Sequence, residues 1–64
     1  MPYYEVEYAN GPFYECIHAK RKPTENEITL NYVNSVASYG PCTKVKRISK
    51  ADALEYYDKI KEHV

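Results

Sequence analysis

The sequence predicts a small α+β protein with the element order strand, strand, helix, strand, helix. Three observations favour this fold class. Apolar and polar residues alternate with a period of two near the N-terminus and again just before Ser49. The pair Asn10-Gly11, which is typical of a hairpin turn, separates the first two alternating stretches. Two helix-start patterns then follow, at Thr24 and at Ser49.

The 64 residues predict a single small domain spanning 1–64. A chain this short buries only about 60% of its unfolded surface, so its stability margin is thin. Nine basic and nine acidic residues balance to zero formal charge, which argues against a dedicated polyanion binder. The sequence has no apolar run long enough to cross a bilayer and no secretory signal pattern. We therefore expect a cytoplasmic protein without a membrane partner, with Cys16 and Cys42 reduced.

The first two strands are predicted at residues 3–8 and 13–19. Their apolar face is expected to carry Tyr4, Val6, Tyr8, Phe13 and Ile17. Their other face is expected to carry Tyr3, Glu5, Glu7, Tyr14, Cys16 and His18. Glu15 falls on the apolar side, and it and Pro12 both favour an edge position for the second strand.

The turn between these strands sets their register. Pro12 lacks an N–H, so the tightest closure at Asn10-Gly11 is disfavoured and we expect a four-residue loop. This loop places Tyr8 opposite Phe13, Val6 opposite Glu15, and Tyr4 opposite Ile17.

Residues 28–39 combine features of a helix and of a strand. β-Branched and aromatic residues are frequent here, and by propensity they favour a strand. On a helix, however, the segment sorts into two sides. The polar side carries Glu27, Asn31, Asn34, Ser35 and Ser38, and the apolar side carries Ile28, Leu30, Tyr32, Val33, Val36 and Ala37. Thr24 and Glu27 form a capping-box pattern before it, and Gly40-Pro41 is a usual helix exit. We therefore predict a helix.

The C-terminal third predicts a strand at residues 42–48 that runs through a capped turn into an amphipathic helix. Ser49 is suited to cap the first free amides, with Asp52 completing the capping box near the positive helix end. Apolar residues recur behind the cap at helical spacing, at Ala53, Leu54, Tyr57, Ile60 and Val64.

These elements predict a three-stranded mixed sheet of order 2-1-3. A right-handed crossover through the first helix places the third strand antiparallel beside the first. Both helices are expected to pack on the apolar face, which leaves the other face open. The order also sets Lys44 and Lys46 beside Glu5 and Glu7. Such cross-strand charge pairs contribute roughly 0.2–1 kcal/mol each.

The sequence offers little that could carry catalysis. Cys16 and His18 share a strand face, and a cysteine nucleophile needs a base or a positive field. No orienting third group or oxyanion-hole signature accompanies them, so we expect no catalytic residue and no enzyme. Cys16, His18, Cys42 and His63 lack the paired short-loop spacing of structural zinc sites, and we expect neither a metal nor a cofactor.

The leading functional hypothesis is a non-enzymatic protein-interaction module: a small adaptor, regulator or inhibitor of a protein partner. No motif is specific enough to name a family. Tyrosine is enriched at protein interfaces and loses little rotamer entropy there. The expected partner-binding residues are Tyr3, Tyr14, His18, Lys44, Lys46 and Tyr56. The same face could form a homodimer contact. By analogy, small cofactor-free chains of this size are common among phage and mobile-element products that block a host protein.

The alternative is a weak nucleic-acid-binding domain. Two basic clusters near tyrosines are similar to the surfaces with which some proteins read single-stranded RNA. Glu5 and Glu7 at the centre of the same face would repel phosphate, so nucleic acid is the less favoured partner. The candidate residues are Lys20, Arg21, Lys22, Lys44, Lys46 and Arg47.

Overall fold

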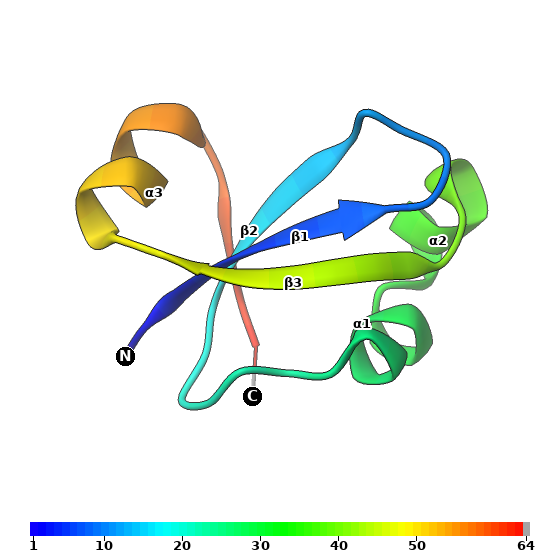
Figure 1. The fold of residues 1–64 in the computed structure, drawn as a ribbon, viewed down its shortest axis with the longest axis horizontal. Helices are drawn as coiled ribbons and strands as arrows, with labels where there is room; N and C mark the ends of the chain where they lie inside the picture. Colours follow the sequence, from blue (N-terminus) through cyan, green and yellow to red (C-terminus); the bar gives the residue numbers. More distant parts are fainter. Residues whose placement is uncertain (64) are drawn as a thin grey trace.

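The computed structural model describes residues 1–63 as a four-stranded mixed sheet with three short helices (Figure 1). The elements are β1 Tyr3–Tyr8, β2 Tyr14–His18, α1 Glu25–Asn31, α2 Val33–Tyr39, β3 Cys42–Ile48, α3 Lys50–Tyr56 and β4 Ile60–Glu62. The strand order is β3-β1-β2-β4. β2 and β3 pair antiparallel with β1, and β4 pairs parallel with β2. The α+β class and the order of the first three strands are confirmed, whereas the fourth strand and the third helix were not expected.

The predicted register of the first hairpin is confirmed. The partners across β1 and β2 include Val6 with Glu15 and Tyr4 with Ile17. The loop closes where the Tyr8 amide donates to the Phe13 carbonyl, at 3.4 Å. The loop length sets this pairing. Burial reinforces it, because a one-residue slip would turn every buried β1 side chain toward the polar face.

The helix predicted after Thr24 forms, but as two helices that meet at Tyr32. The backbone of Tyr32 (φ −110°, ψ 63°) lies outside the helical region and separates α1 from α2. The predicted capping box is present: the Glu27 amide donates to Thr24 Oγ1 at 3.1 Å, and the Thr24 amide donates to Glu27 Oε1 at 3.2 Å. Gly40 ends α2 at φ +81°, a conformation that favours glycine.

The C-terminal helix is shorter than predicted. Ser49 caps α3 as expected by accepting a hydrogen bond from the Asp52 amide, at 3.1 Å. The helix ends at Tyr56, and Tyr57 is already extended (φ −127°, ψ 124°). Leu54, which the spacing assigned to the buried side, is 59% exposed. Val64, also assigned to this helix, lies outside the described residues.

The segment after α3 forms β4 instead of continuing the helix. Ile60 pairs with Cys16, and Glu62 pairs with His18. The predicted edge position of β2 is therefore wrong, because β4 occupies the other side of that strand. Local helical spacing failed here because tertiary pairing overrides a local pattern: residues 60–62 take their backbone partners from β2 instead of from a preceding helical turn.

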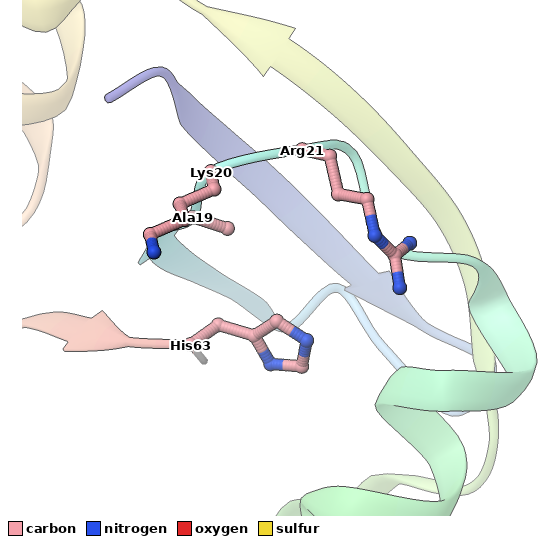
Figure 2. Close-up of a pocket in the computed structure, with 4 residues that line it drawn as sticks. All are labelled: Ala19, Lys20, Arg21 and His63. Atoms are coloured by element: carbon pink, nitrogen blue, oxygen red, sulfur yellow. The ribbon is translucent and has the colours of Figure 1, made fainter.

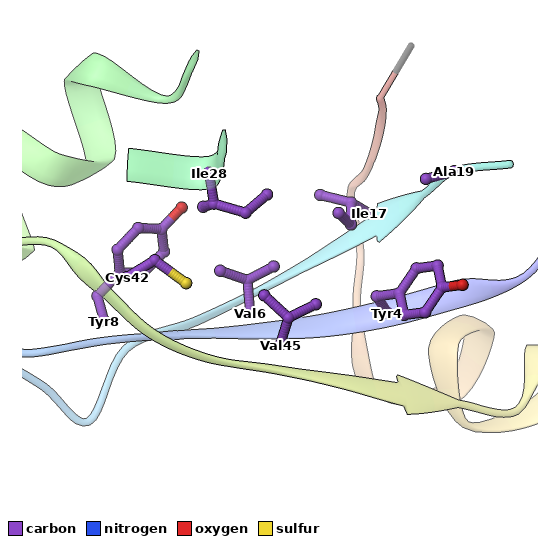
Figure 3. Packing of buried hydrophobic residues seen from close by; sticks show 8 residues of the cluster. All are labelled: Tyr4, Val6, Tyr8, Ile17, Ala19, Ile28, Cys42 and Val45. Carbon is purple, nitrogen blue, oxygen red and sulfur yellow. The ribbon is translucent and has the colours of Figure 1, made fainter. Parts of the chain in front are cut away.

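The core lies between the sheet and the helices α1 and α2 (Figure 3). Its buried cluster consists of Tyr4, Val6, Tyr8, Ile17, Ala19, Ile28, Cys42 and Val45. Full burial of one large apolar side chain contributes about 1.5–3 kcal/mol, so the few members of this cluster carry much of the stability. Leu30 and Val33 were assigned to the apolar helix side, yet both are exposed, since the break at Tyr32 divides that side.

The third helix packs on the opposite face of the sheet, so the prediction that both helices share the apolar face is wrong. Figure 3 shows α1 on one side of the sheet and α3 on the other. Ala53 of α3 is fully buried. Just after the helix, the Tyr57 hydroxyl donates to Glu5 Oε2 at 2.5 Å. The face expected to be open is therefore partly covered, and Glu5 is half-buried beneath the end of α3.

Candidate functional site

The polar face of the sheet carries the charged register predicted from the sequence. Glu7 lies between Lys44 on β3 and Tyr14 on β2, since both are its strand partners. In the same way, Glu5 lies between Lys46 and Cys16. Figure 1 shows β1 running between β3 and β2, which places these glutamates in the middle of the sheet.

Although the register is confirmed, the two lysines form no ion pair with these glutamates in the described part of the chain. The salt bridges there are His18–Glu62, Arg21–Glu27 and Lys61–Glu15. Tyrosine hydroxyls bind the two carboxylates instead: Tyr57 donates to Glu5, and Tyr14 donates to Glu7 at 3.4 Å. Lys44 and Lys46 are both exposed, so their ammonium groups are available to another molecule.

The Tyr57 hydroxyl is held protonated by its surroundings. Burial raises its pKa first, and the hydrogen bond to Glu5 raises it further, because ionisation would set two negative charges side by side. This contact fixes the end of α3 above β1. The part of the polar face beyond it stays exposed, where Tyr14 is 43% accessible.

Tyr56 is the most exposed tyrosine described, at 72%. It lies on α3, next to the residue that fixes this helix to the sheet. We group it with three exposed residues of the polar face under the name tyrosine–lysine surface: Tyr14, Lys44, Lys46 and Tyr56. These four belong to the six partner-binding candidates that the sequence suggested.

The other two candidates, Tyr3 and His18, are engaged within the molecule. Their rings stack at 4.4 Å between centroids. His18 Nδ1 lies 3.0 Å from the Glu62 carboxylate, and His18 Nε2 lies 3.0 Å from the Met1 carbonyl. Both residues are half-buried. The structure thus gives them contacts that hold the N-terminal residues and β4 against β2.

The two basic clusters lie on different parts of the fold. Lys20, Arg21 and Lys22 form the loop after β2, whereas Lys44, Lys46 and Arg47 lie on β3. β1, which carries the acidic residues of the polar face, separates β2 from β3. Within residues 1–63 the clusters therefore lie on elements that do not neighbour each other in the sheet.

A cavity of about 260 Å³ lies beside the first cluster, lined by Ala19, Lys20, Arg21 and His63 (Figure 2). In Figure 2, Arg21 and His63 border the same space, whereas the Lys20 side chain extends away from it. Arg21 is also paired with Glu27, at 3.3 Å. The pairing of β4 with β2 brings His63 to this place, where the sequence gave no reason to expect it.

The cysteines show no sign of reactivity. Cys16 and Cys42 are free and buried. Burial is the main cause that raises the pKa of each thiol, which keeps it protonated at neutral pH. No group of three or more His, Cys, Asp or Glu side chains among residues 1–63 is arranged to hold a metal ion.

The structure also accounts for Glu15, the misfit on the apolar face. Its carboxylate accepts hydrogen bonds from the Tyr8 hydroxyl at 2.6 Å and from Ser35 Oγ at 2.9 Å, and it pairs with Lys61 at 2.6 Å. Burial alone would raise the pKa of Glu15, but these contacts outweigh it and lower the pKa. Sequence reasoning missed the network because it placed Ser35 on the polar side of a helix and continued the last helix through Ile60, where the structure has the strand that carries Lys61.

No protein-family model matches the sequence, and neither the curated proteins nor the solved structures include a significantly similar chain. None of the helices in residues 1–63 has the length and apolar character needed to span a bilayer. Function is therefore inferred from the chemistry of the surface.

Proposed function

We propose that this chain is a non-enzymatic protein-interaction module that acts as a small adaptor, regulator or inhibitor of a protein partner. The observation that carries the proposal is the tyrosine–lysine surface. It exposes two tyrosines, a residue type enriched among the energetically dominant residues of interfaces. It also exposes two lysines without salt bridges in the described chain, although acidic neighbours lie in register with them.

The buried, protonated thiols are consistent with a binding role rather than a catalytic one. We place the protein in the cytoplasm, where two free thiols would persist. A second copy of the chain is an alternative occupant of the same surface.

Site-specific photo-crosslinking tests this proposal. A photoreactive phenylalanine analogue replaces Tyr14 or Tyr56 in the full chain, expressed in its native host. Leu30 supplies the matched control, because it is 68% exposed and lies on α1, on the other side of the sheet. We expect one and the same protein to be crosslinked from positions 14 and 56 and not from position 30. Equal crosslinking from all three positions, or none from 14 and 56, would contradict the proposal.

Nucleic-acid binding is the competing proposal. Its support is the basic loop beside the cavity, where Arg21 and His63 border the same space. The position of β1 argues against nucleic-acid binding, because its Glu5 and Glu7 lie between β2 and β3 and repel phosphate. Binding to single-stranded RNA that weakens steeply with added salt, and that is lost in a K20E/K22E variant, would favour this alternative.

A further inference from the structure

β3 is an outer strand of the sheet, and its far edge pairs with no other strand of residues 1–63. Its beginning is covered: the Cys42 amide donates to Thr29 Oγ1 of α1, at 3.0 Å, and the Cys42 thiol donates to the Lys44 carbonyl, at 3.6 Å. The strand register also shifts opposite Tyr8, near that end. The stretch 44–48 is therefore the free edge, and we call it the β3 edge. An unpaired strand edge of this kind can pair with another chain.

The charges on the β3 edge disfavour a second copy of the same strand. Lys44, Lys46 and Arg47 are all exposed. Two antiparallel copies centred on Val45 would set each Lys44 opposite a Lys46 of the other copy. Like charges directly opposite each other destabilise a strand pair. Lysines on an edge strand act against self-association in this way, and they leave the edge open to a strand of opposite charge.

The molecule itself contains a strand of that kind. On its inner side, β3 pairs with β1, which sets Glu7 opposite Lys44, Val6 opposite Val45, and Glu5 opposite Lys46. A sequence that alternates acidic and apolar residues thus fits this strand. Neither lysine forms an ion pair with these carboxylates among residues 1–63, where Tyr14 and Tyr57 donate hydrogen bonds to them.

We propose that the β3 edge accepts an extended acidic segment of a partner protein as a fifth strand. The acidic side chains of that segment lie against Lys44 and Lys46, and its apolar side chains lie on the side of Val45. Main-chain hydrogen bonds supply affinity, and the lysines select for negative charge. This inference rests on the proposed interaction function and specifies the chemistry of the partner.

An NMR titration tests the inference. The ¹⁵N-labelled chain is titrated with a blocked hexapeptide of alternating valine and glutamate. We expect amide shifts concentrated at residues 44–48. A K44E/K46E variant should bind about tenfold more weakly, since two attractive neighbours become repulsive. The matched control K20E/K22E carries the same charge change away from the edge and should bind like the wild type.

Two further peptides separate strand pairing from simple charge attraction. A peptide that alternates valine and lysine should not bind. A valine–glutamate peptide with every amide N-methylated keeps its charge but has no N–H group to donate to the ladder, and it should also fail. Equal binding of the N-methylated peptide, or shifts centred on residues 20–22, would overturn the inference.

The crosslinking experiment distinguishes failure of this inference from failure of the proposed function. If the protein crosslinked from positions 14 and 56 is crosslinked equally well in the K44E/K46E background, the interaction function stands and the β3 edge is rejected. If those positions crosslink no protein while the acidic peptide still pairs with β3, the edge is correct and the proposed function fails.

Discussion

The Tyr57 hydroxyl donates a hydrogen bond to the Glu5 carboxylate across 52 positions of sequence, at 2.5 Å. This contact joins the end of α3 to the central strand on the polar face. Lys46 is the strand partner of Glu5 on β3, but the two side chains form no ion pair among residues 1–63. One tyrosine thus joins the third helix to the sheet, while Lys46 stays exposed on the same face.

Replacing Tyr57 with phenylalanine should lower the free energy of unfolding. Hydrogen bonds to charged groups contribute about 1.5–3 kcal/mol, and partial exposure of Glu5 places the expected loss near the lower end, about 1–2 kcal/mol. Urea denaturation measures the change. Y56F is the matched control and should be neutral, because Tyr56 is exposed. Equal effects of the two substitutions would contradict the role assigned to Tyr57.

The same contact predicts a loss of stability in alkali. Burial and the neighbouring Glu5 carboxylate raise the pKa of Tyr57, and burial and Glu15 raise that of Tyr8. Since the folded protein holds these protons more tightly than the unfolded chain, their contribution is retained below about pH 10 and lost as pH rises above it. Thermal unfolding at pH 8 to 11 should show the wild type converging toward Y57F. A constant difference between them would be inconsistent with this coupling.

Glu15 predicts the opposite dependence at low pH. Its pKa is lowered, so the stabilisation it provides is present above the unfolded value, about 4.3, and is lost as pH falls through the folded value. E15Q should lose about 1–3 kcal/mol at pH 7 by leaving Lys61 without its partner. It should also show a flatter melting profile between pH 5 and 3. E55Q, at an exposed position, is the control, and an identical profile for E15Q and the wild type would refute the prediction.

Truncation after Lys59 tests the structural role of β4. Ile60 pairs with Cys16, so removal of β4 should uncover the outer side of β2 and make Cys16 reactive toward a thiol reagent. Measured in a C42S background, the truncated chain should react at least about tenfold faster than the full chain, provided that circular dichroism shows it folded. Full protection of Cys16 in the folded, truncated chain would show that β4 does not shield it.

How much of this structure could be predicted depends on how far apart the interacting residues lie in the sequence. The register of Val6 with Glu15 follows from the turn between them, and the pairing of Lys44 with Glu7 follows from a handedness rule. The partner of Glu15, Lys61, lies on a strand that only tertiary pairing creates. Local helical spacing extended α3 through that segment for the same reason.

The candidate surface could be predicted only in part. Tyr14 and Tyr56 were expected to be exposed, and they are, because strand alternation and helical phase decide their direction. The packing of α3 over Glu5 was not expected. Amphipathicity indicates which side of a helix is apolar, but it does not indicate on which face of a sheet that helix packs. The break at Tyr32 was not expected either, and it leaves the apolar side chains of Leu30 and Val33 exposed.

Leu30 and Val33 offer a competing binding surface, so amide hydrogen exchange tests directly whether the partner binds the tyrosine–lysine surface. Exchange is compared for the free chain and for its complex with the protein crosslinked from position 14. The account predicts slowed exchange in β3 and around Tyr14, with α1 unchanged. Protection confined to α1 and α2, around Leu30 and Val33, would contradict the assignment of the binding surface.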